Sequence, residues 1–482
     1  MEKTSYLGKK GYTIKKSEFT QSQLYELRKE LHVKPNTGMT GYGVTITYPI
    51  YRESTNKIYI PRYFGIEKFG ETSTVIIPKG VDIELSFSGS LFQYQTNIVN
   101  KFISHIGESG GGLLDVEPGK GKTVMALNIL SQIKKKTLVV VHKSFLLNQW
   151  KERIEQFLPN AKVGIIQGKT MDVEDKDIVI GMLQTLSTKK ISDDIINQFG
   201  FTIYDECHHL SAEVFSQVMI NITTNYVLGL SGTMTRKDGL TKVFKWFVGP
   251  IVHKEKTESQ EEVMINCLHF QDVDNEEYNE VETDFKGNPQ YSKMITKVCS
   301  NETRTDMIVN VVAYEMKQEI KQQIMILAHN KNLINELFDK IKVFEPSVGL
   351  YIGGMKEKQL KESETKKVII ATYAMASEGL DIKTLTTLLM ATPKTDVCQS
   401  VGRILRSKHA RPLVIDIIDD HDIFRRQFKK RKSYYNKKKY NIRMYDNLNK
   451  YLSNDFLHVT NNKKKEEKKI PVCLINYSDS AS

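Results

Sequence analysis

Short apolar runs alternate with amphipathic stretches between residues 91 and 252 of the 482-residue chain. The segments between the runs have helical periodicity, as in SFLLNQWKERIEQF (144–157). Apolar runs without polar alternation are typical of parallel strands that helices cover on both faces. The pattern therefore predicts an α/β domain over residues 91–252. Its strand candidates are TLVVVH (137–142), DIVIG (177–181), FTIYDE (201–206) and YVLGLS (226–231).

A second series of the same kind spans residues 301–420. The stretch between the two series, residues 253–300, is polar and acidic in its middle, so we expect a connector with some helix. The expected fold class is α/β, with two parallel-sheet domains in tandem. The strand candidates of the second series are QIMILAHN (323–330), SVGLYIGG (347–354), KVIIATY (367–373), LTTLLMAT (385–392) and PLVIDII (412–418).

The two ends of the chain have different patterns. Residues 1–90 contain short β-branched runs that Pro61 and glycines interrupt, which predicts a small α+β domain. Residues 421–482 form a basic extension that begins with a helical stretch, HDIFRRQFKKRKSYYNKKKY. We expect the aromatic side chains of this helix, Phe424 and Phe428 among them, to pack inward while its lysines face a nucleic acid.

The positive charge of the chain is concentrated in this last region. The formal net charge is +12, and the last 62 residues hold 16 Lys and Arg against 6 Asp and Glu. A concentrated basic region suits a polyanionic partner, most simply a nucleic acid. The alternative is a solvated lysine-rich tail with no specific partner.

The spacing of the cysteines and the hydropathy of the chain indicate the cellular compartment of the protein. The five cysteines form no C-x-x-C pair, which argues for a reducing compartment and against disulfides. No apolar run approaches the roughly 18 residues that cross a bilayer, and the first residues lack the apolar core of a secretory signal. We therefore expect an intracellular protein without a membrane partner.

The segment DVEPGKGKT (115–123) is a candidate phosphate-binding loop. Gly121, Lys122 and Thr123 match the end of the pattern G-x-x-x-x-G-K-[ST], whereas Val116 occupies the place of its first glycine. The loop follows a strand candidate and leads into a helix candidate, where backbone N–H groups can bind phosphates. Lys122 would reach the β- and γ-phosphates of ATP, and the Thr123 hydroxyl would bind Mg²⁺. The alternative is a chance string in a lysine-rich chain.

The segment YDECHH (204–209) ends another strand candidate with two adjacent acids. Asp205 would hold Mg²⁺ through water, and Glu206 would orient and deprotonate an attacking water molecule. The acids could instead cap a helix. The cysteine and histidines that follow could suggest zinc, but the chain has no second Cys/His cluster to complete such a site.

Together these two motifs resemble those of the superfamily 2 DExH-type helicases. Further strings resemble the remaining motifs of that family in the same order, over about residues 91–410. The strings PRYFG, ECHHLSAEVFS and LGLSGTMTRKDGL resemble the XPB/UvsW-like branch, which includes the poxvirus-type transcript-release helicase of large DNA viruses. The motif strings are FQYQ (92–95), VVVHKSFLLNQW (139–150), GMLQTLS (181–187), LSGT (230–233), ATYAMASEGLDI (371–382) and QSVGRILR (399–406).

The resemblance implies two RecA-like domains and a role for each matched residue. The implied catalytic residues are Lys122, Asp205, Glu206, Gln399, Arg403 and Arg406. The implied ATP-binding residues are Gln95, Gly119, Lys120, Gly121, Lys122, Thr123, Gly379 and Asp381, with Mg²⁺ at Thr123 and Asp205. Coupling of ATP to strand movement is implied for His208, Ser231 and Thr233. Nucleic-acid contacts are implied for Lys143, Ser144, Gln184, Thr185 and Thr372, each of which could equally be a helix cap or a solvated residue.

The arginines bear on the mechanism. Arg403 and Arg406 are three residues apart and so face one side of a helix. An arginine that reaches the transferred phosphoryl group can be worth about 10³–10⁵ in rate. We expect ATP to lie in the cleft between the two domains, which would close on binding and open on hydrolysis. The alternative is that the arginines are surface charges.

The sequence thus predicts an ATP-dependent DNA helicase or translocase, and the resemblance implies 3′ to 5′ movement on single-stranded or forked DNA. Transcript release, recombination or repair are the implied processes. An RNA-directed ATPase acting on RNA or a DNA–RNA hybrid is the first alternative, and a catalytically inactive nucleic-acid-binding subunit is the second. For a viral protein, we expect the transcription machinery as a partner and the virion or the cytoplasmic replication factory as the location.

Overall fold

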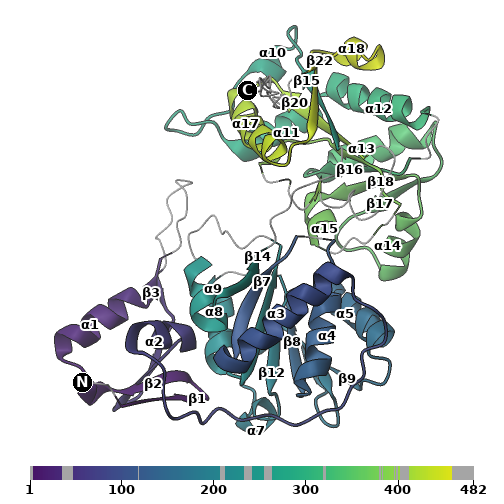
Figure 1. Cartoon of the computed structure of the whole chain (residues 1–482). Helices are drawn as coiled ribbons and strands as arrows, with labels where there is room; N and C mark the ends of the chain where they lie inside the picture. Colours follow the sequence, from purple (N-terminus) through teal and green to yellow (C-terminus); the bar gives the residue numbers. More distant parts are fainter. Residues whose placement is uncertain are drawn as a thin grey trace, which may run out of the picture. The chain divides into compact units, whose positions relative to one another are not determined.

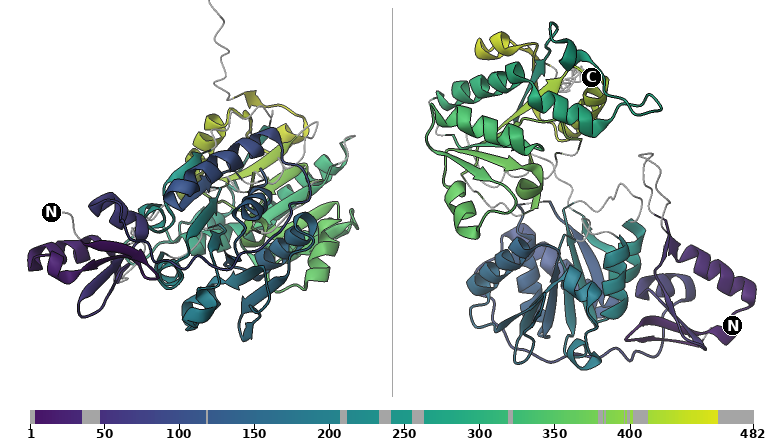
Figure 2. Two further views of the ribbon diagram at one scale, coloured as in Figure 1. Left: turned by 60° about the horizontal axis from the view of Figure 1, so that its bottom comes forward. Right: turned by 180° about the vertical axis from the view of Figure 1, so that it is seen from behind.

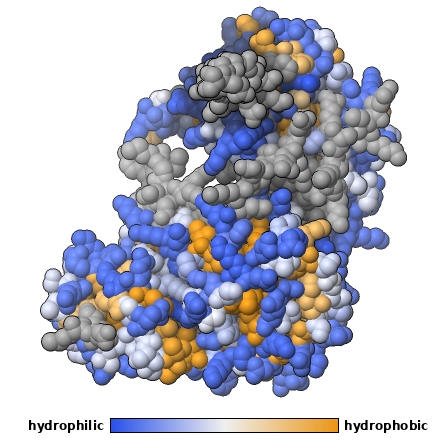
Figure 3. Space-filling model, in the orientation of Figure 1, coloured by the Kyte–Doolittle hydropathy of each residue, from blue (hydrophilic) through white to orange (hydrophobic). Residues whose placement is uncertain are grey.

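The computed structural model divides the chain into two compact units, residues 1–256 and 257–482 (Figure 1). None of the described helices has the length and apolar character needed to span a lipid bilayer. On the face drawn in Figure 3, hydrophilic residues predominate and apolar patches lie among them. The structure describes residues 4–34, 47–117, 119–206, 212–232, 241–254, 263–318, 322–378, 382, 384–395, 397, 400–401 and 412–458.

An eight-stranded sheet forms the core of the first unit, with strand order β10-β9-β11-β8-β12-β13-β7-β14. All neighbouring strands are parallel except β10, which is antiparallel to β9. The strands are β7 (Gly111–Asp115), β8 (Thr137–Val141), β9 (Val163–Gln167), β10 (Thr170–Met171), β11 (Ile178–Met182), β12 (Phe201–Tyr204), β13 (Tyr226–Ser231) and β14 (Ile251–Lys254).

Helices cover both faces of this sheet, which explains why its central strands carry apolar residues without alternation. Side chains of α3, α4 and α5 pack in the core on one face, and those of α6, α8 and α9 pack on the other. The helices are α3 (Gln93–Ser109), α4 (Lys122–Ile133), α5 (Ser144–Phe157), α6 (Leu183–Thr188), α7 (Asp193–Ile196), α8 (Ala212–Asn221) and α9 (Thr241–Val248).

A small α+β domain precedes this sheet in the same unit. Its antiparallel sheet has the order β1-β2-β6-β5, and β3 pairs with β4 in a separate two-stranded ribbon. The domain lies beside α8 and α9 (Figures 1 and 2). Its elements are β1 (Ser5–Gly8), β2 (Gly11–Lys15), η1 (Lys16–Glu18), α1 (Gln21–Glu30), β3 (His32–Val33), β4 (Tyr48–Pro49), β5 (Arg52–Glu53), β6 (Lys57–Ile60) and α2 (Arg62–Phe69).

Aromatic packing and hydrogen bonds fix this domain to the larger sheet. The rings of Phe64 on α2 and Trp246 on α9 lie edge to face with centroids 4.9 Å apart. The Tyr63 hydroxyl donates to the Ser109 carbonyl at 2.9 Å, and burial raises the pKa of Tyr63 to about 12. The N–H of Val81, in the segment that follows the domain, donates to the Gln198 carbonyl at 2.9 Å.

The second unit contains another eight-stranded sheet, with the order β17-β18-β16-β19-β20-β15-β21-β22. Only β22 is antiparallel to its neighbour. The strands are β15 (Met264–Phe270), β16 (Ile324–Ala328), β17 (Val348–Tyr351), β18 (Val368–Thr372), β19 (Thr387–Met390), β20 (Leu413–Asp419), β21 (Asn441–Tyr445) and β22 (Leu457–His458).

Helices again lie on both faces of this sheet. Side chains of α11, α12 and α13 pack into one core cluster, and those of α15 and α17 pack into the other. The predicted α/β fold class, with two tandem RecA-like parallel-sheet domains, is confirmed. The helices are α10 (Glu276–Asn279), α11 (Tyr291–Ser300), α12 (Glu302–Met316), α13 (Lys331–Lys342), α14 (Glu357–Glu364), α15 (Tyr373–Glu378), α17 (Asp422–Lys437) and α18 (Leu448–Leu452).

Two segments outside the predicted strand series also belong to this sheet. β15 lies in the range 253–300 and pairs with β20 and β21, and β21 lies in the extension 421–482. β15 pairs with strands far away in the sequence, and β21 pairs with β15 and with the short β22, so no local strand–helix pattern marks either strand. The division of the chain at residues 90, 252, 300 and 420 stays a prediction. The aromatic residues Phe424 and Phe428 of α17 are buried, as the helical spacing predicted.

Candidate functional site

The carboxyl edge of the first parallel sheet gathers most of the predicted site residues that the structure describes. The loop 116–121 follows β7, Lys143 follows β8, Gln184 follows β11, and Asp205 follows β12. Because these strands are parallel, their carboxyl ends lie along one edge of the sheet, where open α/β sheets bind ligands.

Val116 is compatible with a phosphate loop because its position does not need a glycine. Its side chain is fully buried in the core beneath the sheet edge, and its φ is not in the left-handed region. Its N–H donates to the Ser231 carbonyl at 2.9 Å, which ties the start of the loop to the end of β13. Gly119 (φ 85°) and Gly121 (φ 81°) supply the left-handed turns that precede α4.

Gln95 joins the start of α3 to this loop. Its side-chain oxygen accepts the Phe92 N–H at 3.0 Å, and its amide donates to the Lys120 carbonyl at 3.1 Å. A Cβ atom at Gly121 would lie 2.4 Å from the Gln95 amide nitrogen, so a side chain at 121 would displace this contact. Recognition of adenine by Gln95 stays a prediction, because the structure engages its amide with protein atoms.

Lys122 is the first residue of α4 and forms an ion pair with Glu206. The Lys122 Nζ lies 2.8 Å from the Glu206 Oε1, and both side chains are largely buried. Glu206 adopts a left-handed conformation (φ 48°) directly after β12, which turns the chain sharply at the strand end. The geometry brings together the lysine of one motif and the second acid of the other, 84 residues apart.

Asp205 is buried beside this pair. The Trp150 indole N–H donates to its Oδ2 at 2.8 Å, and the Glu206 backbone N–H donates to its Oδ1 at 2.9 Å. Burial, and then the neighbouring Glu206 carboxylate, raise the pKa of Asp205 to about 6, against the opposing effects of Lys122 and Trp150. A cation bound at this carboxylate would favour its charged form.

The donors fit magnesium better than a transition metal. Mg²⁺ keeps several waters and binds one or two carboxylates together with substrate phosphates. The Asp205 carboxylate and the Thr123 hydroxyl are oxygen donors of that kind. Among the described residues, no group of three or more His, Cys, Asp and Glu side chains could hold a metal ion by itself.

Trp150 was not singled out by the motif comparison, although it is the last residue of the quoted string 139–150. It is 1% exposed and lies on the buried stripe of α5 with Leu146, Leu147 and Ile154. That stripe by itself predicts only a core residue. Its hydrogen bond to Asp205 depends on α5 packing against the end of β12.

The residues of the first unit that were predicted to contact nucleic acid differ in solvent exposure and in their hydrogen bonds. Ser144 and Gln184 are exposed, and the Gln184 amide donates to the His142 carbonyl at 2.9 Å. Thr185 is buried, and its hydroxyl accepts the Gly168 N–H at 3.0 Å, so this hydroxyl takes part in the fold. Burial lowers the pKa of Lys143, the residue that caps α5.

The remaining predicted residues fall into two groups. Thr372 ends β18 of the second unit, and its hydroxyl accepts the Met375 N–H at 3.4 Å, so it caps α15. Those that lie outside the described residues are His208, Thr233, Gly379, Asp381, Gln399, Arg403 and Arg406.

A strand–loop–helix with Lys122 at the helix start, facing two acids that end another parallel strand, defines a phosphate-loop nucleotide-binding domain. The model of the family "Type III restriction enzyme, res subunit" matches residues 88–236, which cover most of this domain but not α9 and β14. The chain is 37% identical over 449 residues to "Putative ATP-dependent RNA helicase L396" of Acanthamoeba polyphaga mimivirus, with 90% of this chain and 86% of the relative covered.

More distant relatives are similar over most of the chain. "Putative helicase 161L" of Invertebrate iridescent virus 6 is 25% identical over 401 residues, with 79% of this chain and 88% of the relative covered. The crystal structure of T4 UvsW is 20% identical, with 89% of this chain and 96% of that chain covered and a TM-score of 0.34, a value at which the likeness carries no argument. The chain belongs to the superfamily 2 helicases of large DNA viruses, a family of ATP-hydrolysing, nucleic-acid-binding enzymes.

Proposed function

We propose that this protein is an ATP-dependent DNA helicase or translocase that uses Mg²⁺ and moves 3′ to 5′ along its substrate. The observation that carries the proposal is the 2.8 Å ion pair between Lys122 and Glu206, next to the buried Asp205. It supports a common site for the phosphate loop and the acidic pair. The family sets the activity, and the finer assignment to DNA rests on the motif resemblance.

Within this site each residue has a separate task. The N–H groups at the start of α4 and the ammonium of Lys122 bind the phosphates of ATP. When Lys122 turns to the phosphates, the Glu206 carboxylate would orient a water molecule and accept its proton. Asp205 and Thr123 would hold Mg²⁺, and the bound ion would supply positive charge against the phosphates.

The motif 399–406 supplies the remaining part of the proposal. Gln399, Arg403 and Arg406 would act in catalysis, the two arginines by stabilising the charge that develops on the transferred phosphoryl group. Arg403→Ala should therefore lower the rate of ATP hydrolysis about 10³-fold or more while ATP still binds. Gly379 and Asp381, in the motif 371–382, would bind the nucleotide. His208, Ser231 and Thr233 would couple hydrolysis to the grip on nucleic acid.

An RNA-directed ATPase is the second candidate, because the 37% identical viral relative is named a putative RNA helicase. Steady-state ATP turnover, measured with single-stranded DNA, forked DNA, a DNA–RNA hybrid or RNA, separates the two. We expect DNA to stimulate turnover most, and the Lys122→Ala variant to show none. Stimulation by RNA alone would replace the DNA assignment, and no turnover with any substrate would favour an inactive binding subunit.

We also propose a path for the nucleic acid across the protein and a biological process for the enzyme. Contacts from Lys143, Ser144, Gln184 and Thr372 to phosphates would hold one strand. The branch resemblance favours transcript release in an infected cell, with the viral transcription machinery as the partner, in the virion or the cytoplasmic replication factory. Release of RNA from stalled elongation complexes upon addition of protein and ATP tests this process.

A further inference from the structure

An open groove of about 470 Å³ lies between the small N-terminal domain and the first parallel-sheet domain, within the first unit. One side consists of Lys9 and Lys10, at the turn between β1 and β2, together with Arg52 on β5. The parallel-sheet domain contributes the end of α6, the segment 189–191, α7 and the residues 220–223 at the end of α8. A neighbouring cavity has room for only about 30 Å³, which fits one water molecule rather than a ligand.

Positive charge dominates this groove. The described residues that line it include five cations, Lys9, Lys10, Arg52, Lys189 and Lys190, and one carboxylate, Asp193. The carboxylate lies 3.6 Å from the Lys9 ammonium, and both side chains are well exposed. A cleft lined by charges of one sign attracts a polyanion.

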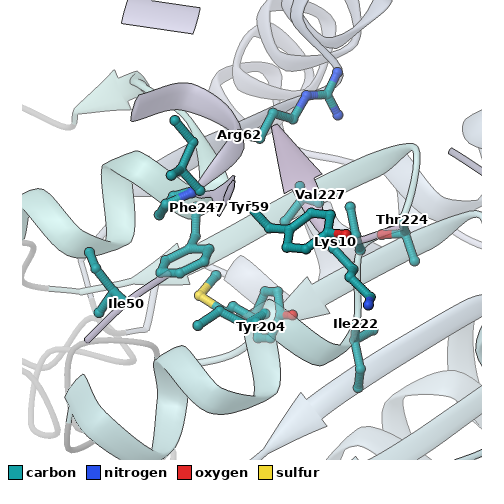
Figure 4. A pocket seen from close by; sticks show the side chains of 15 residues that line it. Lys10, Ile50, Tyr59, Arg62, Tyr204, Ile222, Thr224, Val227 and Phe247 are labelled. Carbon is teal, nitrogen blue, oxygen red and sulfur yellow. The ribbon is translucent and has the colours of Figure 1, made fainter. Parts of the chain in front are cut away.

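Two further cations of the groove, Lys10 and Arg52, contact neutral groups rather than carboxylates. The Lys10 ammonium lies 4.9 Å from the centre of the Tyr59 ring, and Figure 4 shows Lys10 near Tyr59 and Ile222 at the seam between the two domains. The Arg52 guanidinium donates to the Asn221 side-chain oxygen. Such contacts orient the cations but leave their charge for a ligand.

The groove continues the proposed path of the nucleic acid. α6 begins next to Gln184, one of the proposed contacts, and its last residues, Leu186 to Thr188, line the groove. Six helical residues span about 9 Å, and Lys189 and Lys190 follow directly. That length corresponds to only a few phosphates along a strand, so one continuous backbone could reach from Gln184 to these lysines.

We infer that this groove binds the sugar-phosphate backbone of the nucleic acid on which the helicase acts, and thereby makes the N-terminal domain part of the substrate track. The inference rests on the proposed contact at Gln184 and deepens the proposed function. Contacts through phosphates are independent of sequence, and their affinity falls steeply with salt.

The test compares the full-length protein with the triple variant Lys10→Gln, Lys189→Gln, Lys190→Gln. Glutamine retains the aliphatic stem and removes the charge. The matched control removes three exposed lysines elsewhere in the first unit, as Lys29→Gln, Lys79→Gln, Lys101→Gln. Fluorescence anisotropy with labelled single-stranded and duplex DNA, and with single-stranded and duplex RNA, gives Kd at several salt concentrations.

We expect the triple variant to raise Kd about 10-fold or more for the preferred nucleic acid. The slope of log K against log salt should shrink by about 2 to 3, since each lost phosphate contact removes about 0.9 on duplex DNA. ATP turnover without nucleic acid and the melting temperature should be unchanged, and the control variant should bind within about 2-fold of wild type.

A variant that binds nucleic acid more tightly than wild type cannot owe this change to misfolding. Asp193→Asn removes the one lining carboxylate and releases Lys9, so it should lower Kd about 2- to 5-fold. Wild-type Kd and slope in the triple variant would overturn the inference, as would equal weakening in the control. Loss of binding to labelled polyglutamate, with nucleic-acid binding intact, would assign the groove to an acidic protein instead.

The outcomes also separate this inference from the proposed function. If wild-type protein hydrolyses ATP but binds no DNA, the DNA assignment fails, and the RNA arm then decides whether the groove inference holds for RNA. If wild-type protein binds DNA and the triple variant binds it equally well, only the groove inference fails.

Discussion

At the scale of single residues, two side chains join the nucleotide loop and its acids to neighbouring helices. Trp150 links α5, whose first turn carries proposed nucleic-acid contacts, to the carboxylate of Asp205. Gln95 links the start of α3 to the Lys120 carbonyl in the phosphate loop. Each contact can be removed by a single substitution that leaves the surrounding fold in place.

Trp150→Phe should lower kcat for nucleic-acid-stimulated ATP hydrolysis about 10- to 100-fold. A smaller aromatic ring replaces the indole, and a hydrogen bond to a charged group, worth about 1.5–3 kcal/mol, is lost. Steady-state kinetics measure the effect. The other tryptophan of the chain provides the control, since Trp246→Phe removes an indole that packs on Phe64 and should change kcat by less than about 2-fold. Equal kcat for wild type and Trp150→Phe would show that the indole only fills space.

Gln95→Ala should raise the KM for ATP about 10-fold, because it removes the hydrogen bond to the Lys120 carbonyl of the loop and the one from the Phe92 N–H, each worth about 0.5–1.5 kcal/mol. Parallel measurements with GTP distinguish the two roles of this residue. If Gln95 only supports the loop, KM rises equally for both nucleotides. A loss of the preference for ATP over GTP would instead support recognition of adenine.

At the scale of elements, buried ion pairs attach helices to the second sheet. The Arg304 guanidinium on α12 donates to both oxygens of Asp419 at the end of β20, at 2.5 and 2.9 Å, and to the Ala391 carbonyl at 2.7 Å. The Arg431 guanidinium on α17 binds Asp416 of the same strand in the same way, at 2.8 and 2.9 Å. The basic extension is therefore anchored by one of its own arginines.

Arg304→Met should lower the free energy of unfolding of the second unit by about 3–5 kcal/mol, since it leaves the buried Asp419 carboxylate without its cation. Denaturant unfolding monitored by hydrogen exchange in α12 and β20 measures the change. Arg425→Met breaks the pairs of the exposed Arg425 with Asp420 and Asp422 and should cost less than about 1 kcal/mol. Equal costs for the two variants would contradict this ranking.

His421 should make the stability of the same unit depend on pH. Burial lowers its pKa below the ordinary value of 6.5; Asp419 and Asp420 act to raise this pKa, and Lys297 and Arg425 to lower it. The unfolded chain therefore binds the proton more readily than the folded protein. The stabilising effect is full above pH 6.5 and is lost as the pH falls below that value towards the lowered pKa.

Thermal unfolding between pH 7.5 and 5.0 tests this dependence. The melting temperature should fall with pH in wild type and fall less steeply in His421→Phe. Substitution of the exposed His32 by Gln should retain the wild-type dependence. The same slope in His421→Phe as in wild type would assign the pH dependence to other groups.

At the scale of the molecule, the N-terminal domain is built onto the first parallel sheet and is not loosely tethered to it. Its own core includes Val243 of α9, and the rings of Trp246 and Phe247 pack against that core. This attachment holds the two sides of the basic groove together, so the proposed substrate track depends on it.

Phe64→Ala should weaken this attachment by about 3–5 kcal/mol, the usual cost of removing a buried phenyl ring. Faster hydrogen exchange should appear in α2 and α9, and nucleic-acid affinity should fall, while ATP turnover without nucleic acid changes little. Tyr25→Ala, at a 64% exposed position on α1, is the control. Unchanged exchange in α2 would show that other contacts hold the domain.

The order of residues along the chain was enough to predict the two strand–helix series, the phosphate loop and the acidic pair. Each is a strand followed at once by a turn or a helix, so a few neighbouring residues carry the whole signal. Val116 posed a question because the motif places a glycine there. Valine fits this position because its side chain is buried in the core. That core exists only once β7 and its neighbours are packed together.

Only the tertiary structure decided the contacts between residues far apart in the chain. β15 and β21 become neighbours in one sheet, Trp150 reaches Asp205, Gln95 reaches Lys120, and Lys10 and Lys189 line the same groove. The physical reason is that the apolar pattern specifies which side of an element is buried but not which element covers it. Packing of whole sheets and helices makes that choice, and the chemistry of the site follows from it.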